Sequence, residues 1–244
     1  MKRFAAFIKK LLFNERWKCN LCGKEIFSGY FCPECEKKIN YNDKNICNRC
    51  GRKTAVPEEY CDSCKNIDFP ADKVRSALCY DKTSSILIQN FKYNGKKYLA
   101  EIFSEFISNV YFKNFLSADF ITFVPMSVKE KKNRGFNQSE LLAIATAERI
   151  GLPVKDILLK TRETDRQAKL NREERLKNLR GAFKVTDKKE VSGKKVLLID
   201  DVFTTGATSL TISGILKKAG ADKVTVLTVA SVPNIRENTQ SDEQ

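Results

Sequence analysis

The chain has 244 residues, of which 42% are hydrophobic and 30% are charged. This length fits one ordinary domain with a small extra module, and the composition suffices for a buried core. No apolar run reaches 18 residues, which argues against a membrane-spanning helix. The formal net charge of +14 favours anionic partners such as phosphates and nucleic acid, although the same charge also serves solubility alone.

The sequence contains nine cysteines and no histidine. Any metal site must therefore use thiolates or carboxylates, and a catalytic triad or general base that depends on histidine is excluded. Eight of the cysteines lie between Cys19 and Cys64. This change in composition predicts a domain boundary near residue 70. The ninth, Cys79, falls in a predicted strand and is expected to be a core residue.

Residues 1–18 form a basic, partly apolar stretch. Lys9 and Lys10 interrupt its apolar residues and no small-residue cleavage site follows, so we expect a short amphipathic helix and not a signal peptide. This helix could pack on the body of the protein, or contact a membrane or nucleic acid. Without a secretory signal, the expected location is the cytoplasm.

Residues 19–70 carry four C-x2-C pairs. Two thiolates three residues apart can face one tetrahedral ion across a tight turn, and four thiolates complete a closed structural zinc site. The pairs form an internal repeat, since CNLCG at 19–23 returns as CNRCG at 47–51. The repeat predicts two sequential zinc sites in a zinc-ribbon-like module. The ligands of the first are Cys19, Cys22, Cys32 and Cys35, and those of the second are Cys47, Cys50, Cys61 and Cys64.

Other arrangements of these cysteines remain open. The first and third pairs could share one ion in an interleaved arrangement, and iron could replace zinc. Disulfides or a redox role are disfavoured because cytosolic thiols stay reduced. Four thiolates leave no open coordination position for a catalytic water, so we expect the sites to be structural. A segment of roughly 50 residues with few core hydrophobes also needs a bound metal ion to fold.

From residue 71 to residue 235, short apolar runs alternate with amphipathic stretches. The expected strands cover residues 74–80, 119–125, 194–201 and 223–230. The expected helices cover residues 84–93, 96–115, 138–150, 172–179 and 207–219. Strands alternating with helices predict an α/β fold with a parallel, doubly wound sheet. Residues 236–244 are polar and are expected to form a disordered tail.

The most specific motif for chemistry is VLLIDDVFTTGAT at residues 196–208. A buried strand delivers Asp200 and Asp201 to the carboxyl end of the sheet, where α/β proteins bind ligands. The turn that follows exposes backbone N–H groups at a helix N-terminus, and the helix dipole favours an anion there. The hydroxyls of the turn can donate further hydrogen bonds, and its glycine lets the backbone approach closely. These residues are Thr204, Thr205, Gly206 and Thr208.

Carboxylates at this position can accept hydrogen bonds from two ribose hydroxyls, or hold Mg²⁺ through water. The P-loop motif G-x4-G-K-[ST], which also follows an apolar strand in ATPases, is absent from the sequence. The alternative is an ordinary strand–turn–helix in which Thr204 or Thr205 caps the helix. Adjacent aspartates followed by Thr-Thr-Gly argue against this alternative.

At residues 196–208 the sequence resembles the type I phosphoribosyltransferases, whose loop for phosphoribosyl pyrophosphate (PRPP) has this form. Three further segments, residues 91–100, 124–143 and 160–183, look like the ComF-type family. That family pairs an N-terminal cysteine zinc finger with a PRPP-binding domain and is tied to natural competence for DNA uptake. The resemblance runs from residue 19 to about residue 232.

Two features depart from the typical pattern of that family. The chain has eight clustered cysteines where four are typical, which leaves the number of zinc ions open. Met126 and Ser127 occupy the short loop after the strand at 119–125, which in the family approaches pyrophosphate.

The resemblance implies a PRPP site with Mg²⁺, in which Asp200 and Asp201 are the catalytic acids. The remaining PRPP-binding residues of the loop would be Val202, Phe203, Thr204, Thr205, Gly206, Ala207 and Thr208. The pyrophosphate side would be formed by Pro125, Met126, Lys129 and Arg134. Residues 160–170 would form a mobile loop over the ligand that contains Arg162 and Gln167, or else a plain polar linker.

Three weaker candidates share a helix face, Arg172, Arg175 and Asn178, and either clamp phosphates or pair with neighbouring glutamates. Lys92 either joins the site or is a solvated helix residue.

Two functions follow from these expectations. The first is a PRPP-binding phosphoribosyltransferase-like protein that acts in DNA uptake, with an unidentified acceptor. The second is a non-catalytic adaptor whose zinc module and basic surface bind single-stranded DNA and a helicase or another protein of DNA uptake. A transcription regulator that senses PRPP is a third reading, but the sequence has no helix-turn-helix signal.

Overall fold

The computed structural model describes residues 17–65, 67–164, 174 and 178–235. The predicted tail at 236–244 lies outside them, as does the predicted helix at 1–18 apart from Trp17–Lys18, which form strand β1. The chain divides into two compact units, Met1–Asn40 and Tyr41–Gln244, and each is described by itself. This division falls inside the cysteine-rich segment and not at residue 70. The limits 19–70 and 71–235 therefore stay predictions.

The first unit contains a small antiparallel pair, β1 with β2 (Glu25–Ile26), followed by the short helix α2 (Pro33–Glu36). The tight turn between the strands needs Gly23, whose φ is +76°, and the Gly23 N–H donates to the Cys19 carbonyl oxygen at 2.9 Å. Pro33 begins α2 at a position where a missing N–H costs nothing. We call residues 17–40 the first ribbon.

The second unit is built on four parallel strands in the order β3-β8-β7-β4. They are β3 (Lys73–Cys79), β8 (Lys223–Ser231), β7 (Lys195–Phe203) and β4 (Phe120–Phe123). Their residues are almost all buried, as expected for parallel strands covered on both faces. All four strands were predicted from the sequence, with Asp200 and Asp201 in the third of them, and β7 extends two residues beyond the predicted end, to Phe203.

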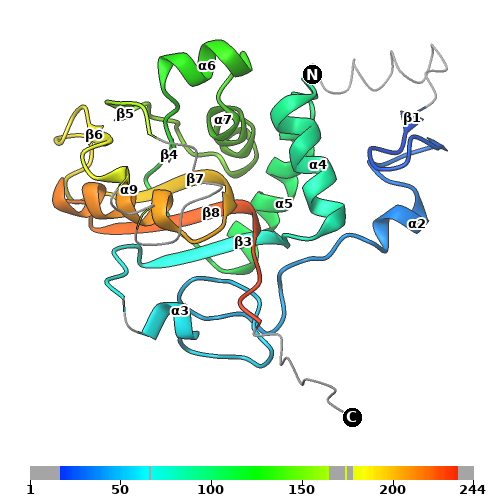
Figure 1. The fold of residues 1–244 in the computed structure, drawn as a ribbon, viewed down its shortest axis with the longest axis horizontal. Coiled ribbons are helices and arrows are strands. Elements are labelled where there is room, and N and C mark those ends of the chain that lie inside the picture. The colour runs from blue at the N-terminus through cyan, green and yellow to red at the C-terminus, as the bar shows by residue number, and fades with distance from the viewer. Residues whose placement is uncertain (1–16, 66, 165–173, 175–177, 236–244) are drawn as a thin grey trace. The chain divides into compact units, whose positions relative to one another are not determined.

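Helices cover both faces of this sheet (Figure 1). On one face lie α4 (Lys82–Tyr93), α5 (Leu99–Lys113) and α7 (Gln138–Ile150), of which α5 and α7 pack on each other and on the strands. On the other face lies α9 (Ala207–Lys218). The doubly wound arrangement predicted from the sequence is therefore confirmed. No helix in the described part of the chain combines the length and the apolar composition needed to cross a bilayer.

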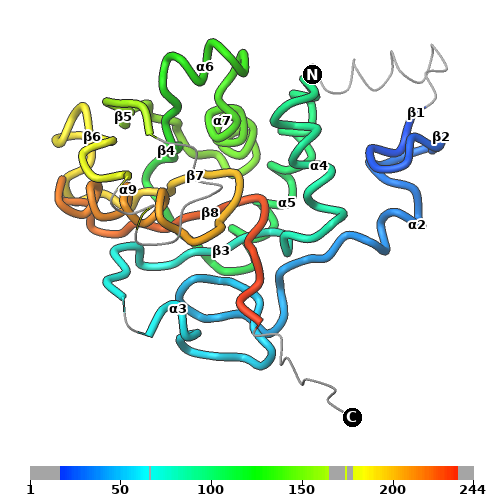
Figure 2. Tube along the Cα trace, in the orientation of Figure 1, coloured from blue at the N-terminus to red at the C-terminus, as the bar shows by residue number. Residues whose placement is uncertain are grey.

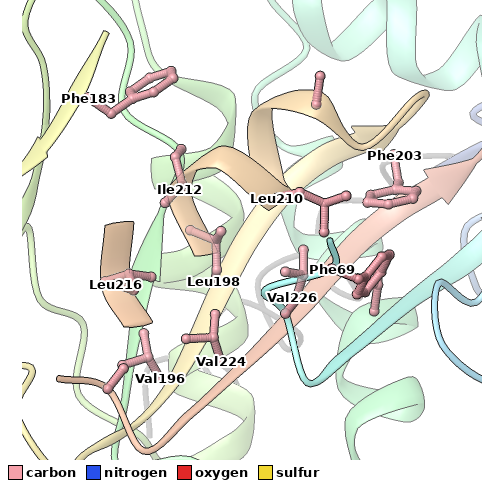
Figure 3. Packing of buried hydrophobic residues seen from close by; sticks show 14 of the residues in the cluster. Phe69, Phe183, Val196, Leu198, Phe203, Leu210, Ile212, Leu216, Val224 and Val226 are labelled. Atoms are coloured by element: carbon pink, nitrogen blue, oxygen red, sulfur yellow. The ribbon is translucent and has the colours of Figure 1, made fainter. Parts of the chain in front are cut away.

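The core on the α9 side follows the alternation of the strands. Val196 and Leu198 of β7 and Val224 and Val226 of β8 face α9, which contributes Leu210, Ile212 and Leu216. Figure 3 shows these side chains in contact, with Phe203 and Phe69 at one end of the cluster. Each of the seven aliphatic side chains is at most 6% exposed. Burial of this kind is worth roughly 1.5–3 kcal/mol per large side chain and fixes where α9 begins.

Several elements of the second unit were not expected from the sequence. Helix α6 (Val128–Arg134) follows β4, and its first turn is closed by a capping box between Ser127 and Glu130. Strands β5 (Leu158–Lys160) and β6 (Phe183–Val185) pair antiparallel and form a separate two-stranded sheet, which we call the hairpin. The predicted helix at 172–179 falls largely outside the described residues.

Residues 41–65, which we call the second ribbon, contain helix α3 (Asp62–Lys65) and belong to the same unit as the sheet. Figure 2 shows their loops beside β3, with the chain after β8 running down to meet them. The Asn234 N–H donates to the Lys53 carbonyl oxygen at 2.8 Å, which joins that last segment to the ribbon.

Candidate functional site

A cavity of about 460 Å³ opens beyond the carboxyl ends of β4 and β7. This is the place where α/β sheets bind ligands. Ten of the residues predicted to bind the ligand line it. They are Pro125, Met126, Arg134, Asp200, Asp201, Val202, Thr204, Gly206, Ala207 and Thr208.

Asp200 is buried at the floor of this cavity, with 9% of the residue exposed. Its Oδ2 accepts a hydrogen bond from the Ser209 hydroxyl at 3.0 Å, and its Oδ1 accepts one from Ser139 at 3.3 Å. Burial, and then the charge of Asp201, raise the pKa of Asp200 from 3.8 to about 7. Asp200 can therefore hold a proton at neutral pH.

Asp201 forms an ion pair with Lys92 of α4, with 2.7 Å between Oδ2 and Nζ. Both side chains are about one-fifth exposed, at 17% and 20%. Burial alone would lower the pKa of Lys92, but the charges of Asp201 and Asp200 outweigh it and raise that pKa. Lys92 lines the cavity as well, so of its two readings the structure favours membership of the site. The two acids and one cation form a charged cluster at the edge of β7.

The turn at residues 203–208, which we call the Thr-Thr-Gly turn, brings the N-terminus of α9 to the cavity wall. Gly206 has φ of +79°, a left-handed conformation that favours glycine, and the helix begins at the next residue. Thr204 and Thr208 line the cavity together with this helix start. A 12-residue helix that begins at a cavity offers partial positive charge and backbone N–H groups to an anion.

Two residues of the same turn do not line the cavity. The Thr205 hydroxyl accepts the Ala207 N–H at 3.4 Å, although the N-cap of α9 is Gly206, and Thr205 lines a second, small cavity beside Cys50 and Arg52. Phe203 is buried, with 2% of the residue exposed. Both residues face the second ribbon, a direction that the sequence motif did not indicate.

The cysteines are gathered into two groups, 19/22/32/35 and 47/50/61/64, in each of which the four sulfur atoms lie within 4.8 Å of one another. The Sγ atoms of Cys50 and Cys61 are 3.7 Å apart, and those of Cys22 and Cys32 are 3.8 Å apart. Zinc–sulfur bonds of about 2.3 Å in a tetrahedron separate sulfur atoms by about 3.8 Å, so both groups fit zinc. The grouping matches the sequential arrangement. Cys79 is buried in β3, as predicted.

Family models match both parts of the chain. A model described as a double zinc ribbon domain matches residues 8–65, and one described as a phosphoribosyl transferase domain matches residues 137–243. Competence protein F of Haemophilus influenzae is 29% identical over 215 residues, which cover 85% of this chain and 87% of that protein. Competence protein ComFC of Streptococcus pneumoniae is 33% identical over 150 residues, which cover 62% of this chain and 64% of that protein. The chain is therefore similar to the ComF-type family in both of its parts.

Two further similarities were found. DNA utilization protein YhgH of Salmonella typhimurium is 27% identical over 215 residues, which cover 85% of this chain and 87% of that protein. Among solved structures, a glutamine PRPP amidotransferase of B. subtilis aligns with a TM-score of 0.42 at 23% identity over 58% of this chain and 30% of that one. The fold of this chain is established by its sheet order and by the match to the phosphoribosyl transferase domain.

The cations around the cavity differ from those predicted from the sequence. Arg134 lies over the Tyr93 ring at 5.1 Å and donates to the Gln138 side-chain oxygen at 2.9 Å. Lys129 lies on the exposed side of α6 and does not line the cavity. A different cation, Lys160, lines the cavity, although it was predicted only as the first residue of a loop.

Lys160 is held by Glu130, with 2.8 Å between Nζ and Oε2, and only 7% of the Lys160 side chain is exposed. Burial would raise the pKa of Glu130, but the hydrogen bonds from Lys160 and from the Ser127 backbone outweigh it and lower that pKa. The pairing depends on the hairpin strand β5 lying beside α6. No local sequence signal could have revealed it.

Arg162 does not line the cavity. It is exposed, and its Nη2 donates to the carbonyl oxygens of Asn178 and Arg180 at 2.8 Å each. It thus connects the two ends of the segment between β5 and β6. Among the described residues of that segment, Thr164 and Leu179 line the cavity. Gln167, Arg172 and Arg175 of the predicted ligand-binding loop and helix lie outside the described residues.

Proposed function

We propose that this ComF-type chain binds PRPP with Mg²⁺ in the cavity beyond β7 and transfers its phosphoribosyl group to an acceptor during DNA uptake. The observation that carries the proposal is the convergence of an acid pair and a helix N-terminus on one cavity. Asp200 and Asp201 lie at the end of β7, and α9 begins six residues further on. A sugar phosphate carries the two groups that such a site would bind, which are vicinal hydroxyls for the acid pair and a dianionic phosphate for the helix N-terminus.

The ribose hydroxyls would bind the carboxylates of Asp200 and Asp201, and the 5-phosphate would bind the start of α9 between Thr204 and Thr208. Carboxylate oxygens are the ligands that Mg²⁺ prefers, so the same acid pair fits the ion. When bound, Mg²⁺ would neutralise charge on the pyrophosphate.

The pyrophosphate would lie toward Lys92, Arg134 and Lys160, the cations of the cavity wall. During transfer the bond between ribose C1 and pyrophosphate breaks, and pyrophosphate leaves with the electron pair. The acceptor atom forms the new bond to C1 and loses a proton. Cations fixed before the reaction stabilise the charge that develops on the leaving group. Asp200, whose pKa of about 7 suits proton exchange at neutral pH, would hold the proton that the acceptor loses.

The link to DNA uptake is supported by the relatives of this chain, which are competence and DNA utilization proteins. We place the activity in the cytoplasm, where thiolate zinc sites stay reduced. Single-stranded DNA and other DNA-uptake proteins are its proposed partners, and the net charge of +14 favours a phosphate backbone.

Calorimetric titration with PRPP and Mg²⁺ tests the binding site. Asp200→Asn with Asp201→Asn should abolish binding without unfolding the chain. The matched control is Asp156→Asn, which removes an exposed carboxylate outside the cavity lining and should bind as the wild type does. Unchanged affinity in the double variant would refute the site.

Pyrophosphate release measured across a panel of acceptor bases and amines then tests turnover. Release with one acceptor supports the transferase. PRPP binding without release for any acceptor favours the DNA-handling adaptor, in which the bound ligand only regulates.

A further inference from the structure

We infer that the second ribbon is the rigid support of the Thr-Thr-Gly turn, so that ligand affinity depends on zinc at the second cysteine group and not on zinc at the first. The inference rests on the proposed PRPP function for its binding readout. Arg52 and Phe203 carry the mechanical connection, and both are positioning residues that do not line the main cavity.

The second ribbon is attached to the edge strand β3 by backbone contacts. The Asn42 N–H donates to the Ala77 carbonyl oxygen at 3.0 Å, and the Val74 N–H donates to the Arg49 carbonyl oxygen at 3.1 Å. Gly51 lies so close to the backbone of β3 that a Cβ atom on it would be 2.4 Å from the Val74 carbonyl oxygen. The turn that follows Cys50 therefore cannot move away from β3 or accept a larger residue without losing this fit.

Arg75 of β3 fixes the ribbon from the strand side. It is 5% exposed, and its guanidinium donates to the Asn48 carbonyl oxygen at 2.9 Å and to the Asn48 side-chain oxygen at 3.1 Å. Its Nε donates to the Asn114 side-chain oxygen at 3.1 Å, which adds the end of α5 to the same cluster. Asn48 lies inside the third C-x2-C pair, so the metal-binding turn is held by a buried, charge-assisted contact.

Arg52 connects the metal-binding turn of the second ribbon to the Thr-Thr-Gly turn. Its carbonyl oxygen accepts the Cys47 N–H at 2.9 Å, which makes it part of the metal-binding turn itself. Its guanidinium lies over the Phe203 ring at 5.3 Å, within the range of a cation–π contact. The Phe203 ring in turn fills the space beside Gly206, since a Cβ on Gly206 would lie 2.4 Å from the Phe203 Cζ atom.

Buried apolar contacts also connect the second cysteine group to the Thr-Thr-Gly turn. All four cysteines of the second group are at most 2% exposed, and they share one buried cluster with Phe203, Ala207 and Leu210. Thr205 and Phe203 line a small cavity with Cys50 and Cys64. Four thiols without their metal cannot hold such a segment in one conformation, because metal binding supplies the folding free energy of zinc ribbons. Loss of zinc should therefore release Phe203 and the Gly206 backbone.

The first cysteine group provides a matched control, because its four ligands belong to the other compact unit. The experiment compares Cys47→Ser with Cys50→Ser against Cys19→Ser with Cys22→Ser in the full chain. Each pair removes two of four ligands, and metal analysis should show each variant losing one of two zinc ions.

PRPP affinity should fall at least about 10-fold, or about 1.4 kcal/mol, in the first variant and stay within about 2-fold in the second. Amide hydrogen exchange of the peptide over residues 203–210 should rise in the first variant alone. Equal effects of the two pairs on exchange, or none in either, would overturn the inference.

A second variant tests the inference even if the chain with Cys47→Ser and Cys50→Ser does not fold. Arg52→Met keeps every zinc ligand, and Lys44→Met removes an exposed cation from the same ribbon as its control. Arg52→Met should keep two zinc ions, speed exchange over residues 203–210, and weaken PRPP binding roughly 3- to 10-fold through loss of the cation–π contact. Unaltered exchange in Arg52→Met refutes the inference. If the wild type does not bind PRPP, the proposed function fails, and the exchange data still decide the mechanical connection.

Discussion

Replacing Asp200 by Asn removes a buried acid whose pKa is raised to about 7. A carboxyl group that binds its proton more tightly in the folded chain destabilises that chain as the pH rises from 3.8 through 7, because the unfolded chain ionises more easily. The full penalty above pH 7 is about 4 kcal/mol. Between pH 5 and pH 8, it grows by about 2.5 kcal/mol.

Asn is a suitable probe because it keeps the shape of the side chain and carries no titratable proton. Its oxygen can still accept the Asp201 N–H, which donates to Asp200 Oδ1 at 2.8 Å in the wild type. The Ser209 hydroxyl can rotate to accept from the new amide.

The assay is urea unfolding of the wild type and of Asp200→Asn at pH 5, 6, 7 and 8. Any loss of zinc at low pH affects both chains equally and cancels in the difference. The free energy of unfolding of the wild type should fall relative to the variant by about 2.5 kcal/mol across this range. Asp156→Asn, which changes an exposed carboxylate, should show no such trend. A difference between wild type and Asp200→Asn that is constant with pH would refute the reasoning.

Three further changes test the site and the metal centres. Lys92→Met leaves Asp201 without its ion-pair partner and should weaken PRPP binding roughly 10-fold or more, which titration at pH 7 measures. Arg134→Ala should weaken PRPP binding by a similar factor, whereas Lys129→Ala should change it less than about 2-fold. A larger effect of Lys129→Ala than of Arg134→Ala would show that the cations of the cavity wall are assigned wrongly. Metal analysis should find two zinc ions per chain, and a chelator that removes them should lower the melting temperature; one ion, or an unchanged melting curve, would contradict two structural sites.

Local patterns in the sequence were sufficient for much of the fold. The strand over Asp200 and Asp201, the turn and the helix start at Ala207 could all be predicted, because the apolar run, the threonines and the glycine are contiguous. The cysteine repeat predicted the grouping of ligands for the same reason.

The parts that were missed depend on contacts between distant segments. Lys160 joins the cavity because β5 pairs with β6 and brings it beside Glu130 of α6. Thr205 and Phe203 face the second ribbon, some 150 residues earlier in the chain, and no pattern around the motif records that neighbour. Helix α6 was missed because it is seven residues long and highly charged, with little apolar periodicity.

A crystal structure of the chain with PRPP and Mg²⁺ bound tests the central claim most directly. The account predicts the 5-phosphate at the first turn of α9 between Thr204 and Thr208, with the ribose hydroxyls on Asp200 and Asp201. A structure with PRPP bound elsewhere, or with the cavity unchanged at saturating PRPP, would contradict it.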